Sequence, residues 1–345
     1  MLTPRAEIIL RSIVRQYITK AVPVSSSSIL EDCGLDICSA TIRNEVVRLE
    51  TEGYILRPHH SAGSIPADKG YRYYVESLKD VELPTNDKFL IRHLFHQVEK
   101  EMEEWLNLTV AVLSQRVQSM AVVTMPRQTQ GKVHHIELVS LQDNLVLVVL
   151  ILRGAKVKQQ LINFENTVSQ PELTLISNRL NDAYAGLTRF QIEQKTLNLN
   201  PDELKVKDSL VKMMRGEDEQ ESREPFFDGL HYMLEQPEFH QNQRVQEIMQ
   251  LLEQKKLSKM IAPPSPFNRG VQVYIGQENA SAEIRDYSLI VSQYGIPDEA
   301  VGTIGVIGPT RMAYERALSA VSYLSLVMST LVAELYGKPP GDKDE

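Results

Sequence analysis

The chain has 345 residues, of which 42% are hydrophobic and 24% are charged, and its formal net charge is −8. This composition is that of an ordinary globular protein, and it excludes collagen-like, mainly disordered and purely coiled-coil chains. The length exceeds what one hydrophobic core usually supports, so two or three domains are expected.

The charge is distributed unevenly along the chain. Residues 1–78 contain nine Lys or Arg and nine Asp or Glu, so the remainder carries the whole net charge of −8. Because an acidic protein repels the phosphate backbone, any contact with nucleic acid must use a local basic face. The neutral N-terminal part is where such a face is expected.

Two helices are predicted at the start of the chain. Thr3 followed by proline is a typical helix start, and apolar residues at four-residue spacing predict a helix over residues 4–19. A short second helix is expected to begin at a serine cap near Ser25 or Ser26 and to end at Gly34.

A third helix follows a tight turn, with Ser39 as its expected N-cap. Ile42, Val46 and Leu49 fall on one narrow face at 3.6 residues per turn, so this face should be buried. The helix is expected to end at Gly53.

A β-hairpin is predicted from Tyr54 to Pro66, around the small-residue turn "SAGS", and another helix begins near Gly70. Helices in this order, followed by a hairpin, are typical of a winged helix-turn-helix domain. We assign this domain to residues 1–78 and a polar, proline-containing linker to residues 79–86.

The rest of the chain alternates between helical and strand patterns. One long helix is expected from Asp87 to about Ser119, followed by four strands, a helix and, after a charged helical stretch, three more strands and a long apolar helix. The predicted fold class is therefore α+β with several domains. An antiparallel-sheet domain at 87–199 and 267–338 is expected to be interrupted by a mainly helical domain at 200–266.

The face of the third helix opposite its apolar stripe carries two arginines, one asparagine and no acid. Arg43 and Asn44 suit the edges of guanine and adenine, and Arg48 suits a phosphate. On an isolated helix such a face is most often simply solvated, but the surrounding helices and hairpin favour DNA reading. The predicted DNA-contacting residues of this helix are Ser39, Ala40, Thr41, Arg43, Asn44, Val47 and Arg48.

The hairpin offers polar residues near its arms and its turn, suited to phosphate or the minor groove. They are Arg57, His59, His60, Ser64 and Lys69. The adjacent histidines would point to opposite faces of a strand, so no metal site is predicted for them.

The remaining sequence features give little indication of a metal site, a membrane span or an enzymatic activity. Cys33 and Cys38 match no zinc or redox spacing and are expected to be reduced, buried thiols. No signal peptide or membrane span is predicted, no cofactor is expected, and no hydrolase, phosphate-loop or dinucleotide motif points to an enzyme. The glycines of "GTIGVIGPT" could form an anion site before a helix, but a strand-to-helix turn is the preferred interpretation.

Several long segments together resemble one protein family. The segments "SATIRNEVVRLETEGYI", "RPHHSAGSIPADKGYRYYV", "YIGQEN" and "GTIGVIGPTRMAYERALSAV" are similar, in this order, to HrcA, the bacterial heat-inducible transcription repressor family. The resemblance covers nearly the full length and is weakest in the segment 200–266.

This resemblance implies a cytoplasmic, homodimeric repressor with a winged helix, a GAF-like domain and an inserted dimerisation domain. It implies binding to an inverted-repeat DNA operator of the CIRCE type ahead of the groE and dnaK chaperone operons. It also implies the chaperonin GroEL as a partner, whose titration by misfolded protein on heating releases the genes.

The chain departs from the family pattern where basic residues are common. Ser27 and Ser64 stand where many members carry Lys or Arg, and His60 replaces a frequent Thr. Each phosphate contact that is missing should lower the salt dependence of binding. The alternative function is a ligand-sensing winged-helix regulator that uses the GAF-like domain.

Overall fold

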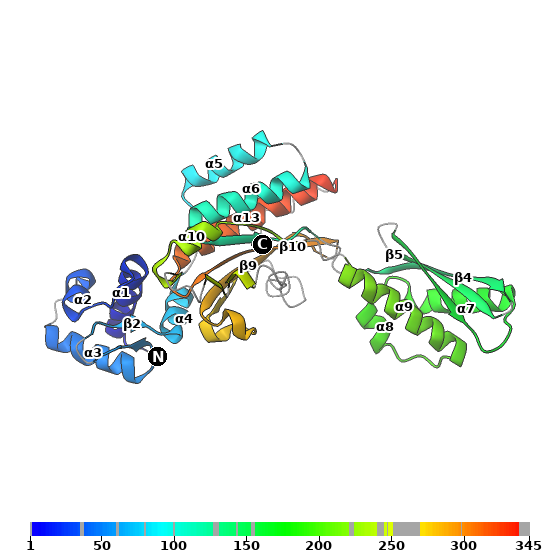
Figure 1. The fold of residues 1–345 in the computed structure, drawn as a ribbon, viewed down its shortest axis with the longest axis horizontal. Helices are drawn as coiled ribbons and strands as arrows, with labels where there is room; N and C mark the ends of the chain where they lie inside the picture. The colour runs from blue at the N-terminus through cyan, green and yellow to red at the C-terminus, as the bar shows by residue number, and fades with distance from the viewer. Residues whose placement is uncertain are drawn as a thin grey trace. The chain divides into compact units, whose positions relative to one another are not determined.

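The computed structural model describes residues 2–34, 38–59, 62–78, 81–98, 101–126, 131–142, 144–152, 156–220, 224–239, 245–246, 248–250, 270–297 and 299–337. The fold is mixed α/β with several sheets (Figure 1). The contacts within the chain divide it into two compact units. The first contains Met1–Pro126, Glu224–Ile296 and Val301–Glu345, and the second contains Arg127–Arg223 and Pro297–Ala300.

The N-terminal helices agree closely with the prediction. Helix α1 spans Pro4–Lys20, α2 spans Ser26–Cys33 with Ser25 as its N-cap, and α3 spans Ser39–Thr51. Gly34 ends α2 with a φ of 57°, in the left-handed region where glycine is favoured. The predicted cap of α3 was wrong by one residue, because Cys38 is the N-cap and makes no side-chain capping hydrogen bond.

A small antiparallel sheet follows these helices. Strand β1 (Ile55–Leu56) pairs with β2 (Ile65–Pro66), and an isolated bridge joins Val24, before α2, to Ser64. Helix α4 then spans Asp68–Ser77 and buries Tyr71 and Tyr74. The order of helices, short strands and helix is the predicted one, although the strands are shorter than expected.

Two helices occupy the region where one long helix was predicted. Helix α5 spans Thr85–Gln97 and α6 spans Met102–Val117. The backbone at Val98, at the end of α5, is extended (φ −89°, ψ 147°), and Glu101 before α6 is also extended. The continuous apolar pattern hid this break because both helices bury apolar residues.

A five-stranded sheet forms the centre of the first unit, in the order β7-β3-β10-β9-β8. The strands are β3 (Met120–Val123), β7 (Phe226–Asp228), β8 (Gln272–Ile275), β9 (Tyr287–Ile296) and β10 (Ala300–Pro309). Strand β3 pairs antiparallel with both β10 and β7, and β8 pairs antiparallel with β9.

Both faces of this sheet are covered, which explains why nearly every residue of β9 and β10 is buried. On one side lie α6 and the long helix α13 (Tyr314–Leu335), side by side in Figure 1. On the other side, Met120 and Val122 pack in a cluster with residues of α10 (Leu230–Leu234), the short 3-10 helix η1 (Pro237–Phe239) and η3 (Ala282–Ile284). A further short 3-10 helix, η2, spans Gly276–Glu278 after β8.

Helix α13 is long and apolar enough to cross a membrane by length and composition. Half of its most apolar window is buried inside the protein, where it packs on β9 and α6. A core helix of a folded domain meets the same two criteria, and its contacts give α13 that role.

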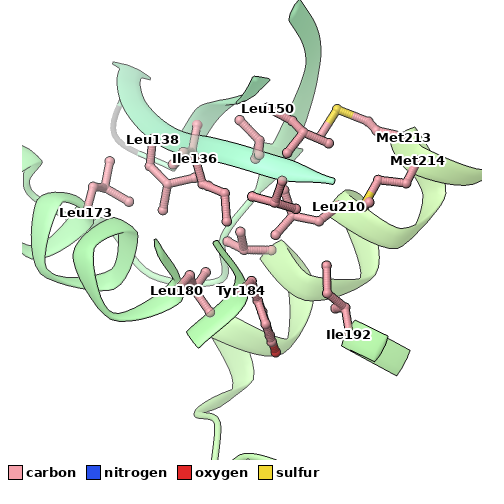
Figure 2. Packing of buried hydrophobic residues seen from close by; sticks show 14 of the residues in the cluster. Ile136, Leu138, Leu150, Leu173, Leu180, Tyr184, Ile192, Leu210, Met213 and Met214 are labelled. Atoms are coloured by element: carbon pink, nitrogen blue, oxygen red, sulfur yellow. The ribbon is translucent and has the colours of Figure 1, made fainter. Parts of the chain in front are cut away.

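The second unit has its own sheet and core. Strands β4 (Val133–Gln142), β5 (Leu145–Leu152) and β6 (Lys156–Asn163) form an antiparallel sheet in that order. Helices α7 (Gln170–Tyr184), α8 (Arg189–Gln194) and α9 (Pro201–Gln220) accompany it. Figure 2 shows Leu138 and Leu150 of the sheet packed with Leu173 and Leu180 of α7 and with Leu210 of α9.

These units differ from the predicted domain ranges. Strands β4–β6 were assigned to the same domain as the later strands, but they form a separate sheet. Residues 200–220 were assigned to an inserted helical domain, but α9 packs on β5 and β6 and completes their core. The segment "QRVQEIMQLLEQKKL", on which that domain partly rested, lies mostly outside the described residues. The sequence shows where strands lie, but not which strands share a sheet.

Candidate nucleic-acid interface

Helix α3 has one buried and one exposed face, as the sequence predicts. Ile42 and Leu49 are fully buried and Val46 is 3% exposed, so the apolar stripe packs into the N-terminal core. The opposite side is solvent-exposed at Ser39, Ala40, Arg43, Asn44, Val47 and Arg48, and Thr41 is half-buried.

Arg43 and Asn44 stand out on the exposed face because the described part of the chain gives them no side-chain partner. No hydrogen bond or ion pair among the described residues involves either side chain. Both sit in the first half of α3, which is the part that helix-turn-helix proteins place at base edges. A guanidinium and an amide are thus free to bind groups outside the protein.

Arg48 is different, because it pairs with Glu52, the C-cap residue of α3. Its Nε lies 2.8 Å from Oε1 of Glu52, one turn along, and this hydrogen bond raises the pKa of the guanidinium. Both side chains remain largely exposed, so the pair is weak and can be exchanged for a phosphate.

The hairpin residues are also engaged within the protein. Arg57 donates two hydrogen bonds to Oε2 of Glu50, one of them from Nε at 2.8 Å, which raises the pKa of Arg57. Lys69 donates to the carbonyl oxygen of Glu52 at 2.8 Å, and its Nζ lies 4.2 Å from the centre of the Tyr54 ring. These contacts join the end of α3 to the strands and to α4.

The predicted DNA-contacting residues at the hairpin turn differ in their exposure to solvent. His59 is exposed, whereas His60 lies outside the described residues. Ser64 is buried at 2% exposure, because its backbone pairs with Val24 through hydrogen bonds of 2.9 and 2.8 Å. The structure therefore removes the Ser64 side chain from the exposed surface, because this residue belongs to a short bridge and not to a free turn.

The cysteines also differ from the prediction that both are buried. Cys38 is exposed and Cys33 is half-buried. The Cys38 Sγ lies 3.2 Å from the Thr41 hydroxyl, and this hydrogen bond lowers the pKa of the thiol. The thiol of Cys38 therefore lies at the N-terminal end of α3, where a helix lowers the pKa of a thiol. The sequence-based prediction missed this site because it placed the N-cap at Ser39.

Metal binding finds no support in the described parts of the chain, where no group of three His, Cys, Asp or Glu side chains could hold an ion. The structure thus brings Arg43, Asn44, Arg48, Arg57 and Lys69 to the helical N-terminal region. Among these, Arg43 and Asn44 are the ones left unpaired within the described residues.

Comparisons with known proteins agree in pointing to one family. A family model described as the HrcA protein C terminal domain matches residues 103–318. The chain is 99% identical over its full length to the heat-inducible transcription repressor HrcA of Dehalococcoides mccartyi strain 195. It is 39% identical to the repressor of the same name from Roseiflexus castenholzii, with 97% of this chain and 96% of that one covered.

A solved structure supports the fold as well. The crystal structure of a hypothetical protein matches with a TM-score of 0.62 at 21% identity, covering 97% of this chain and 99% of the other. These similarities define a regulator of transcription, a class of protein that binds DNA. The chain belongs to the HrcA family of heat-inducible transcription repressors, a family of regulators and not of enzymes.

Proposed function

We propose that residues 1–78 are a winged helix-turn-helix domain that reads a DNA operator with helix α3 in the major groove. The single observation that carries this proposal is the pair Arg43 and Asn44, exposed and without a side-chain partner in the described structure. Arg43 matches guanine O6 and N7, and Asn44 matches adenine N6 and N7. The engaged residues Arg57 and Lys69 would instead fix the hairpin against the end of α3.

The finer proposal concerns the operator and its regulation. The operator is an inverted repeat of the CIRCE type ahead of chaperone operons of the groE and dnaK class, read in the cytoplasm. Release on heating proceeds through titration of the chaperonin GroEL. The name shared with the relatives supports heat induction and repression, and the resemblance of the motifs carries the rest.

An inverted repeat requires a two-fold symmetric protein, and the second unit supports a dimer. Its sheet buries one face, while Leu147, Val149, Val157 and Leu161 share the other face by strand register with the polar residues Gln159 and Glu137. Val157 is 60% and Leu161 54% exposed, and their partners on β5, Ile151 and Leu147, are half-buried. An apolar sheet face of this kind is a typical interaction surface. We propose that this unit, and not the range 200–266, is the dimerisation domain, and that the five-stranded sheet is the GAF-like domain.

Sedimentation tests the dimer. We expect Leu161→Glu to shift the protein from dimer to monomer, because a charge would then lie in the apolar contact. Leu175→Glu is the matched control, since Leu175 is 70% exposed on α7. Equal dimer fractions for wild-type protein and Leu161→Glu would reject the sheet face as the interface.

Selection of bound fragments from genomic DNA, at a stated salt concentration, tests the operator. We expect an inverted repeat upstream of chaperone genes. Enrichment of unrelated sequences would reject the operator proposal. A ligand-sensing role of the GAF-like domain stays an alternative prediction, and a stoichiometric small molecule in native mass spectrometry would favour it.

A further inference from the structure

Two of the motifs that carry the family resemblance lie outside residues 1–78, the domain that the proposed function assigns to DNA reading. They are "YIGQEN" and "GTIGVIGPTRMAYERALSAV", which end β8 and join β10 to α13. In the structure the first motif contacts α4, and the second contacts both α1 and α4. Their role is therefore at the junction between the N-terminal helices and the five-stranded sheet.

Arg72 of α4 makes the first link of this junction. Its Nε donates to Oε1 of Glu278 at 2.8 Å, and its second terminal nitrogen donates to the other oxygen of Glu278 and, at 2.7 Å, to the carbonyl of Val273. The side chains of Arg72 and Glu278 are 28% and 35% exposed. Two parallel hydrogen bonds fix the angle of a guanidinium as well as its distance.

Asp68, at the start of α4, makes the second link. Its Oδ2 accepts a hydrogen bond of 3.0 Å from the backbone N–H of Gln277. Gly276 lets the two segments of the chain approach this closely, since a Cβ there would lie 2.1 Å from that same oxygen. The φ of Gly276 is +52°, a value that also favours glycine.

Arg311, between β10 and α13, makes the third link. It donates to both oxygens of Glu238, at 2.6 and 3.1 Å, and to the carbonyl oxygen of Ile18 in α1 at 2.7 Å. Its side chain is 12% exposed and that of Glu238 is 20% exposed. Arg311 thus joins α1 to a short helix that covers the sheet.

Helix α13 contributes further contacts to α4. Tyr74 donates from its hydroxyl to Oε1 of Glu315 at 2.8 Å, and the rings of Tyr71 and Tyr314 are 5.9 Å apart. Tyr71 and Tyr314 are almost completely buried. A buried aromatic contact surrounded by directional polar contacts permits one relative orientation of the packed elements and opposes sliding.

We propose that Arg72, Glu278 and Arg311 are positioning residues that set the spacing between the two operator half-sites. The inference rests on the proposed function, in which a dimer presents two copies of α3 to an inverted repeat. Half-site spacing is read only if each α3 is held at a fixed orientation relative to the body of the dimer. A domain held only by the polar stretch after α4 would sample many orientations and accept several spacings.

Binding to a series of inverted repeats, identical in their half-sites and differing in the spacing between them, tests this inference. Wild-type protein should prefer one spacing by about 10²-fold or more over repeats changed by half a helical turn. Arg72→Ala and Arg311→Ala should reduce this preference at least tenfold, while the affinity for DNA with a single half-site stays within about twofold of wild type. Retained half-site binding shows that the N-terminal domain is still folded.

Arg116→Ala is the matched control, because Arg116 pairs with Asp87 at similar exposure (28% and 29%) between α5 and α6, away from this junction. It should keep the wild-type spacing preference. A double-mutant cycle of Arg72→Ala and Glu278→Ala should be non-additive, because each change removes the same pair.

The outcomes separate the two proposals. An unchanged spacing preference in Arg72→Ala and Arg311→Ala overturns the positioning role and leaves the proposed function intact. Loss of half-site affinity equal to the loss on the full repeat also overturns it, because the residues would then act on the N-terminal domain itself. Wild-type protein that binds the repeats without preference for spacing overturns the positioning role alone, and wild-type protein that binds none of the repeats overturns both proposals.

Discussion

Helices α3 and α4 belong to the same N-terminal region, yet their arginines are placed in opposite ways. Arg43 of α3 is exposed and has no side-chain partner among the described residues. Arg72 of α4 makes three hydrogen bonds, to Glu278 and to a backbone carbonyl. The two arginines differ because α4 packs against another part of the protein at Arg72, whereas α3 faces solvent at Arg43. An arginine that the fold does not use is the better candidate for an external ligand.

The first prediction addresses the α3 side of this comparison. We expect Arg43→Ala to weaken specific operator binding by about 1–3 kcal/mol for each half-site, because a bidentate contact with a base is lost. The free energy of unfolding should not change, since Arg43 makes no hydrogen bond or ion pair within the described part of the chain. Operator titrations and chemical denaturation measure the two quantities.

Asn44→Ala should also weaken operator binding without changing the free energy of unfolding, but the discrimination that it loses should be at an adenine instead of a guanine. Arg92→Ala is the control, because Arg92 is exposed on α5. If Arg43→Ala footprints the operator as wild type does, the exposed face of α3 is not the reading surface.

The second prediction addresses the α4 side. Gly276→Ala should lower the free energy of unfolding by about 1–2 kcal/mol, because the methyl group would displace Asp68 and the residue would keep an unfavourable positive φ. Gly34→Ala separates the two causes, since Gly34 has a φ of +57° and nothing within 4 Å of the added carbon. Equal destabilisation of both variants in chemical denaturation would show that the contact with Asp68 contributes nothing.

The same comparison shows what the sequence could predict. The stripe of Ile42, Val46 and Leu49 repeats at a local period, so its burial and the exposure of Arg43 opposite it could be predicted. The partner of Arg72 is 206 residues away, and no local pattern indicates it. Both motifs at the junction were visible in the sequence, but their meeting at α4 depends on the tertiary fold.

The burial of strands in the two sheets also could not be predicted from local composition. The run "LVLVVLIL" of β5 is apolar throughout, but its burial alternates between buried and half-buried residues. Composition alone could not distinguish this strand, with one open face, from β10, which is buried along its whole length. Which strands share a sheet is decided by pairing and by the helices that cover them, such as α9 over β5 and β6.

A third, smaller effect follows from the ionisation of Glu278. Burial alone would raise its pKa, but hydrogen bonds from Arg72 and from the backbone N–H of Ile275 lower the pKa below its ordinary value of 4.5. A carboxyl with a depressed folded-state pKa contributes stability that is present above pH 4.5 and is lost as the pH falls through the folded pKa. The free energy of unfolding of wild-type protein should therefore fall more steeply below this pH than that of Glu278→Gln. Identical slopes in denaturation measured across this range would mean that the pair with Arg72 contributes no net stabilisation.

The smallest effect is expected for Arg48, which lies between the two cases because it is exposed like Arg43 but paired like Arg72. Its partner Glu52 is four residues further along, at the C-cap of α3, and exposed pairs of this kind contribute little to stability. We expect Arg48→Ala to leave the unfolding transition unchanged and to reduce the slope of log K against log salt by about 0.9 for each subunit, as for one lost phosphate contact. Glu52→Gln should have the opposite effect on affinity, because it frees Arg48 for the phosphate without removing it. If both variants bind with the wild-type salt slope and affinity, Arg48 remains with Glu52 in the complex, and the contact with the operator is confined to the unpaired side chains of α3.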